Sequence, residues 1–193
     1  YMALSKEQIN SVEEVLKASL RNKFQNYKPE PASMPFHTRL LGKDRLALYS
    51  FIHSLNTNFG TSIFEPVGLA LAQKHFKMAV SQATAGNQIS SGAQAEIQKI
   101  IDGLITATST PNKKEEIERI RKVCQTGDMI KVKPTKVDLM FESKDGAYFL
   151  FDIKTAKPNA GGFKEFKRTL LEWVAVVLAN KPDAVINTFI AIP

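Results

Sequence analysis

Apolar residues recur at helical spacing over most of the chain, and runs typical of strands are concentrated in its last third. The helical spacing predicts helices over residues 5–27, 44–56, 62–79, 93–107, 111–125 and 163–180. A proline-rich connector at 29–35 and a polar loop at 83–92 separate some of these helices. Strands are predicted at 129–133, in a hairpin at 136–154, and at 184–193.

This order predicts the fold class α/β (α+β), with a helical N-terminal half before a mixed sheet. The predicted core runs helix, three strands, helix, strand. The last strand follows a helical crossover and should therefore lie parallel to its neighbour. We expect a single domain over 1–193, with an N-terminal helical part at 1–59 and a helical insertion at 80–127.

The hairpin contains the most informative residues. Its turn, Lys144 to Gly146, is a three-residue loop in which the glycine takes the left-handed position. This turn sets Ser143 against Ala147, and counting back places Asp138 opposite Asp152. Since side chains alternate along a strand, one face is apolar and consists of Val137, Leu139, Phe141, Phe149, Phe151 and Ile153. The other face carries Asp138, Met140, Leu150, Asp152 and Lys154.

Two carboxylates directly opposite each other destabilise a sheet unless a cation lies between them. Oxygen ligands of this kind suit Mg²⁺, Mn²⁺ or Ca²⁺. Lys154 points the same way and can reach the same substrate atom. The alternative interpretation is a salt-bridged surface in which Lys154 only neutralises Asp152.

Composition narrows the function classes. The 193 residues carry a formal charge of +7 with a pI near 9.4, which favours a polyanionic partner. The single cysteine, Cys124, excludes an internal disulfide and a multi-cysteine zinc site. The three histidines lack metal-ligand spacing. Without a signal peptide or a membrane-length apolar run, we expect no membrane partner and a cytoplasmic location.

Asp138, the hairpin and Asp152-Ile153-Lys154 resemble the PD-(D/E)XK nuclease motif, although Val137 stands where the family often has proline. The wider stretches 138–142, 152–159, 170–173 and 189–193 resemble type II restriction endonucleases, in particular the group cutting GGNCC-like sites. The close resemblance covers about the last third of the chain. The predicted order of elements agrees with the fold of this superfamily.

The resemblance implies that Asp138 and Asp152 bind Mg²⁺, with the carbonyl of Ile153 as a further ligand. Mn²⁺ is an alternative, and Ca²⁺ is expected to bind without supporting cleavage. Lys154 would orient or deprotonate the attacking water. Glu65 has two interpretations: a metal ligand on the helix before the sheet, or the carboxylate of a capping box that begins at Ser62.

The implied partner is double-stranded DNA. Further DNA contacts are expected from Lys157, Asn159, Lys164 and Lys167, although each of these side chains is also consistent with a solvated charge. A two-fold DNA site is matched by a two-fold dimer. Because the chain has one Asp/Asp/Lys set and no internal repeat, we expect a homodimer.

Two rival functions stay open at this point. A repair nuclease or junction resolvase of the same superfamily would share the site without sequence-specific cutting. A nucleic-acid-binding protein without catalysis would share the positive charge, but the intact Asp/Asp/Lys set argues against it.

Overall fold

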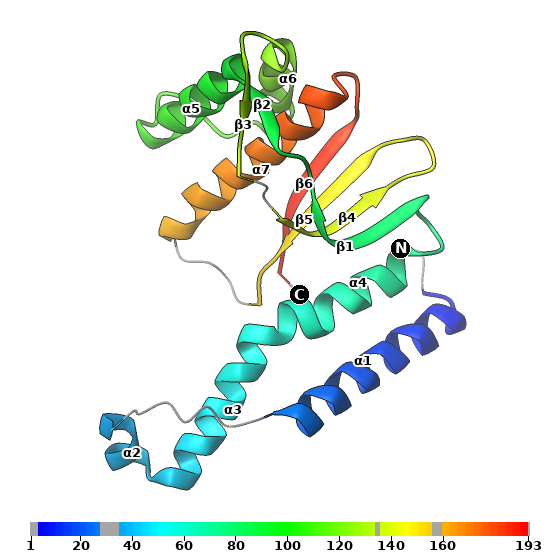
Figure 1. Ribbon diagram of the computed structural model, residues 1–193, viewed down its shortest axis with the longest axis vertical. Coiled ribbons are helices and arrows are strands. Elements are labelled where there is room, and N and C mark those ends of the chain that lie inside the picture. Colours follow the sequence, from blue (N-terminus) through cyan, green and yellow to red (C-terminus); the bar gives the residue numbers. More distant parts are fainter. Residues whose placement is uncertain (1–3, 28–34, 134–135, 156–159, 193) are drawn as a thin grey trace. The chain divides into compact units, whose positions relative to one another are not determined.

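The computed structural model describes residues 4–27, 35–133, 136–155 and 160–192 (Figure 1). The chain divides into two compact units, Tyr1–Leu71 and Ala72–Ile192. The first unit is helical, and the second contains both sheets. This mixed α/β architecture confirms the predicted fold class.

The helices of the first unit are α1 (Lys6–Asn26), α2 (Pro35–Leu41), α3 (Lys43–Phe59), the π-helical turn η1 (Gly60–Phe64) and α4 (Glu65–Ala72). A capping box begins α1: the Gln8 N–H donates to Ser5 Oγ at 3.2 Å, and the Ser5 N–H donates to Gln8 Oε1 at 3.0 Å. Edge-to-face packing of Tyr27 on Phe51, with ring centroids 4.8 Å apart, joins α1 to α3.

The helix boundary predicted between Asn56 and Ser62 is wrong, because α3, η1 and α4 form one uninterrupted helical run. Gly60 adopts the right-handed helical conformation, with φ −52° and ψ −65°, rather than the left-handed one that ends a helix. Ser62 therefore lies inside a helix, and the capping-box interpretation of Glu65 is wrong as well.

The main sheet of the second unit has the order β1-β4-β5-β6. Its strands are β1 (Met78–Thr84), β4 (Lys136–Glu142), β5 (Tyr148–Ile153) and β6 (Ile186–Ala191). The first three pair antiparallel, and β6 lies parallel to β5 after the crossover through α7 (Ala160–Asn180). The parallel pairing predicted for the last strand is confirmed.

The first strand of the main sheet comes from a different part of the chain than predicted. Residues 78–84, predicted as a helix end and loop, form edge strand β1. The stretch predicted as the first strand forms β3 (Met129–Lys131), which pairs with β2 (Gln88–Ser90) in a separate two-stranded sheet. The insertion expected at 80–127 thus starts within a strand of the main sheet. It also contains β2, besides α5 (Ser91–Ile105) and α6 (Lys113–Val123).

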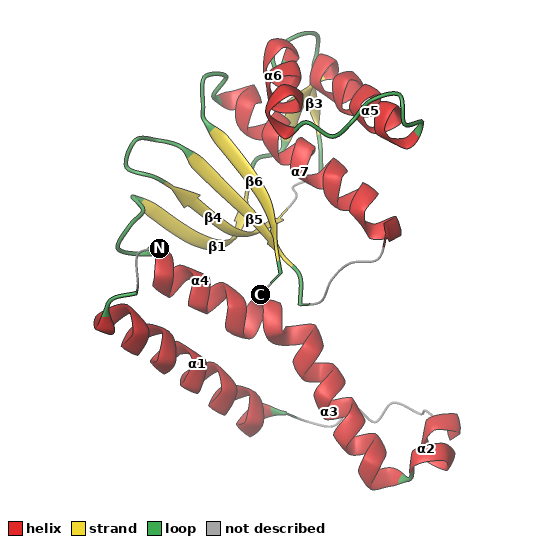
Figure 2. Cartoon of the chain, turned by 180° about the vertical axis from the view of Figure 1, so that it is seen from behind, coloured by secondary structure: helices red, strands yellow, loops and turns green. Residues whose placement is uncertain are grey.

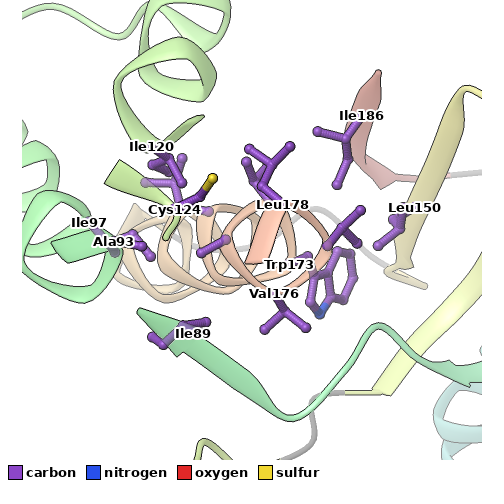
Figure 3. Packing of buried hydrophobic residues seen from close by; sticks show 14 of the residues in the cluster. Ile89, Ala93, Ile97, Ile120, Cys124, Leu150, Trp173, Val176, Leu178 and Ile186 are labelled. Carbon is purple, nitrogen blue, oxygen red and sulfur yellow. The ribbon is translucent and has the colours of Figure 1, made fainter. Parts of the chain in front are cut away.

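The core of the second unit surrounds α7 (Figure 3). Trp173, Val174 and Leu178 of this helix are buried in one cluster with Leu150 of β5 and Ile186 of β6. Helices α5 and α6 pack against α7 as well (Figure 2). Burying a side chain such as Leu150 contributes about 1.5–3 kcal/mol, so α7 is firmly held on the sheet.

Within the described residues, no helix is long and apolar enough to cross a bilayer. The expected cytoplasmic location stays a prediction.

Candidate active site

The predicted hairpin register is confirmed. Leu139 pairs with Phe151 and Phe141 with Phe149, and the Ser143 N–H donates to the carbonyl of Ala147 at 2.8 Å. Gly146 has φ 87°, the left-handed conformation that the three-residue turn requires. Continued by one residue beyond the Leu139–Phe151 pair, the same register sets Asp138 opposite Asp152.

Asp138 is held from the neighbouring strand. Its Oδ2 accepts a hydrogen bond from the backbone N–H of Ile153 at 2.7 Å. Its Oδ1 lies 3.5 Å from Nε2 of Gln82, on the opposite neighbour β1. The carboxylate is therefore approached from both sides of β4.

Asp152 is only 9% exposed, and its Oδ1 lies 2.7 Å from Nζ of Lys154. Burial raises the pKa of the Asp152 carboxyl above its ordinary value, Lys154 lowers this pKa, and the charge of Asp138 raises it. The two carboxylates thus repel each other in a partly desolvated environment. A bound cation would relieve this repulsion.

Lys154 is fixed by three contacts. Besides its ion pair with Asp152, its Nζ lies 4.7 Å from the ring centroid of Phe166 on α7, and its backbone N–H donates to the carbonyl of Ala191 at 2.9 Å. A lysine held in this way presents its charge at a defined point.

The face of the hairpin that carries both carboxylates is partly covered by the core. Leu150, on the same face as both carboxylates, is fully buried in the cluster around α7. The opposite face has aromatic packing, with ring centroids of Phe141 and Phe151 5.3 Å apart and those of Phe151 and Phe189 5.0 Å apart. Both faces are therefore packed, and the acidic pair lies at the end of the α7-covered face.

The other metal ligands expected from the resemblance stay predictions. Ile153 is buried, and its N–H bonds to Asp138; a metal-binding role of its carbonyl is untested. Glu65 belongs to the first unit, where it begins α4 as a buried residue. Lys157 and Asn159 lie outside the described residues.

Two of the expected DNA-binding lysines lie on α7. Lys164 is exposed. Lys167 forms an ion pair with Glu116 of α6, which is only 4% exposed. Glu116 is therefore a buried, charge-paired residue rather than part of a solvated face. Lys167 compensates a buried carboxylate, and its contact with DNA stays a prediction.

The donor set fits a hard divalent ion. Among the residues that the structure describes, no group of three or more His, Cys, Asp or Glu side chains gathers as a metal site. Asp138 and Asp152 form a two-carboxylate set, and Mg²⁺ typically binds to one or two carboxylates and fills its other positions with water and substrate phosphate.

The mixed sheet, with an acidic pair and a lysine at the end of its central strands, is compatible with the restriction endonuclease class of nucleases. The chain belongs to the family described as type II restriction endonuclease, HinfI, whose model matches residues 4–193.

Curated relatives carry related names. Type II restriction enzyme MjaII of Methanocaldococcus jannaschii is 25% identical over 210 residues, covering 100% of this chain and 55% of the relative. Two enzymes of Herpetosiphon aurantiacus are also similar. HgiCII is 26% identical over 144 residues, covering 74% of this chain and 52% of the relative. HgiEI is 28% identical over 139 residues, covering 71% of this chain and 50% of the relative.

The chain spans about half the length of these curated relatives. No solved structure gives a significant match.

Proposed function

We propose that this chain carries the catalytic site of a metal-dependent, sequence-specific endonuclease that hydrolyses phosphodiester bonds of double-stranded DNA. The observation that carries the proposal is the convergence of Asp138, Asp152 and Lys154 where β4 begins and β5 ends. Membership in a family of type II restriction endonucleases supports it. The net charge of +7 favours a polyanionic substrate.

Asp138 and Asp152 are the residues that would hold the ion. When bound, a divalent ion polarises the phosphate and lowers the pKa of bound water. The Ile153 N–H donates to Oδ2 of Asp138, so this bond leaves Oδ1 available to the ion. The repulsion between the two carboxylates also favours cation binding. We propose Mg²⁺ as the working ion, with Mn²⁺ as a substitute and Ca²⁺ as an ion that binds without supporting cleavage.

Lys154 supplies the positive charge of the site. The contacts with Asp152 and Phe166 hold its ammonium beside the carboxylates. From this position it orients the attacking water and offsets the negative charge that develops on the phosphate. Preorganised charge of this kind contributes strongly to catalysis in partly desolvated sites.

We further propose that the enzyme acts as a homodimer on DNA. One catalytic set per chain requires a second copy for cutting both strands of a two-fold site. The first unit exposes large apolar side chains that suit a protein interface: Phe24, Phe36, Leu40, Leu48, Tyr49 and Ile52. Sedimentation on a cognate duplex tests this; one protomer per duplex making double-strand breaks would contradict it.

The decisive experiment incubates unmethylated plasmid DNA with the protein and Mg²⁺ and separates the products on a gel. Discrete fragments are expected, and none with EDTA present. Asp183→Ala, exposed in the turn between α7 and β6, is the matched control and should cut normally. Metal-dependent cutting without discrete fragments would favour a repair nuclease, and binding without cutting would favour a silent DNA-binding protein.

A further inference from the structure

Gln82 has an unusual backbone conformation at the position facing the acidic pair. It lies in edge strand β1 between two regular pairs, Ser81 with Leu139 and Ala83 with Val137, so the register sets it opposite Asp138. Its φ is 51°, in the left-handed region that residues other than glycine rarely adopt. A strained residue next to a candidate site points to a function for its side chain.

The Gln82 side chain approaches the oxygen of Asp138 that Ile153 leaves open. Nε2 of Gln82 lies 3.5 Å from Oδ1, whereas Oδ2 accepts from the Ile153 N–H at 2.7 Å. The longer contact is at the limit of a hydrogen bond. Hydrogen bonds within catalytic sites are often long before the ligand binds and shorten afterwards.

We infer that Gln82 is a positioning residue that sets the orientation of the Asp138 carboxylate for a divalent cation. The Ile153 N–H fixes one oxygen from β5, and the Gln82 amide guides the other from β1. Rotation of the carboxylate about its Cβ–Cγ bond is thereby restricted from two strands. The inference rests on the proposed function, since it concerns the ion that Asp138 would hold.

A purely structural role of Gln82 predicts a different effect of its substitution on metal binding. If Gln82 only completes the strand, glycine at this position relieves the left-handed strain and leaves metal binding unchanged. If Gln82 guides Asp138, the same substitution weakens the ion site even though the fold is not harmed. The loss of such an outer hydrogen-bonding partner typically weakens metal affinity roughly 10- to 100-fold.

The experiment measures Mn²⁺ binding to the DNA-free protein by titration calorimetry, together with the melting temperature. We expect Gln82→Gly to raise the Kd for Mn²⁺ by roughly 10- to 100-fold while the melting temperature stays equal or rises. Gln82→Asn is the second variant, because asparagine tolerates the left-handed region but is one methylene too short to reach Asp138. Thr84→Gly, exposed on the same strand, is the control and should bind Mn²⁺ normally.

An unchanged Kd in folded Gln82→Gly and Gln82→Asn overturns the inference, whether or not the wild-type protein cuts DNA. A raised Kd in a wild-type background that binds Mn²⁺ but cuts no DNA supports the inference and contradicts the proposed function. A wild-type protein that neither binds Mn²⁺ nor cuts DNA overturns both.

Discussion

The backbone N–H of Ile153 donates to Oδ2 of Asp138 at 2.7 Å, so that the candidate catalytic residues of β4 and β5 are directly joined. This bond continues the ladder of the hairpin through a side chain. Its consequence is that the position of Asp138 depends on the same register that the turn at Gly146 sets. The geometry of the candidate site is therefore set by the geometry of the hairpin.

Removing either carboxylate should abolish cutting. Asp138→Ala and Asp152→Ala each remove an expected ion ligand, so cleavage with Mg²⁺ should stop while DNA binding survives. Cleavage is followed on plasmid DNA and binding by fluorescence anisotropy, with Asp183→Ala as the control. Near-normal cleavage by either variant would rule out this site.

Lys154→Met should stop the chemistry and leave cation binding largely intact near pH 8, because lysine is no ligand and methionine preserves the apolar stem against Phe166. Loss of the ammonium should also shift the pKa of Asp152 further upward, since Lys154 lowers it. Cation binding by the variant should therefore weaken as the pH falls. Titration calorimetry at two pH values measures this. A loss of binding at high pH equal to that of Asp152→Ala would show that the role is misassigned.

Lys167→Met should destabilise the second unit. The substitution leaves the buried carboxylate of Glu116 without its cation, and breaking such a pair typically costs about 3–5 kcal/mol. Lys164→Met, exposed on the same helix, should have little effect on stability. Denaturant unfolding measures both variants.

The double variant Lys167→Met with Glu116→Gln should recover much of the lost stability, because the buried carboxylate that lost its ion pair is neutralised. If Lys167→Met instead retains full stability and loses DNA affinity, the ion pair is not the main role of Lys167, and the DNA-contact prediction gains support.

Glu172 should make stability depend on pH. Burial raises the pKa of this carboxyl above its ordinary value of 4.5, and Arg168 lowers it. Below the ordinary value both folded and unfolded chains are protonated there, and no difference arises. As the pH rises, the unfolded chain ionises first, so the folded state loses stability until its own carboxyl ionises.

Glu172→Gln should therefore raise the melting temperature relative to the wild type near pH 8 and change it little near pH ~4. Glu165→Gln, exposed on the same helix, is the control and should give no such difference. A melting temperature of Glu172→Gln below that of the wild type near pH 8 would show that the ionised carboxylate is stabilised in the folded state.

The sequence alone determined those features that depend on neighbouring residues. The turn at Lys144 to Gly146 has one favoured geometry, and this geometry fixed the register that sets Leu139 against Phe151. Because side chains alternate strictly along a strand, the same register places Asp138 and Asp152 on one face. The capping box at Ser5 is equally local. The motif from Asp138 to Lys154 lies within this hairpin, which is why its geometry was predictable.

Only the tertiary structure decided the features that depend on distant partners. Residues 78–84 have a weak strand pattern, and they form β1 by pairing with β4, which follows more than fifty residues later. Glu116 is buried because α7 brings Lys167 to it. Gln82 could not be predicted as a site residue, because it meets Asp138 only through the long-range pairing of β1 with β4.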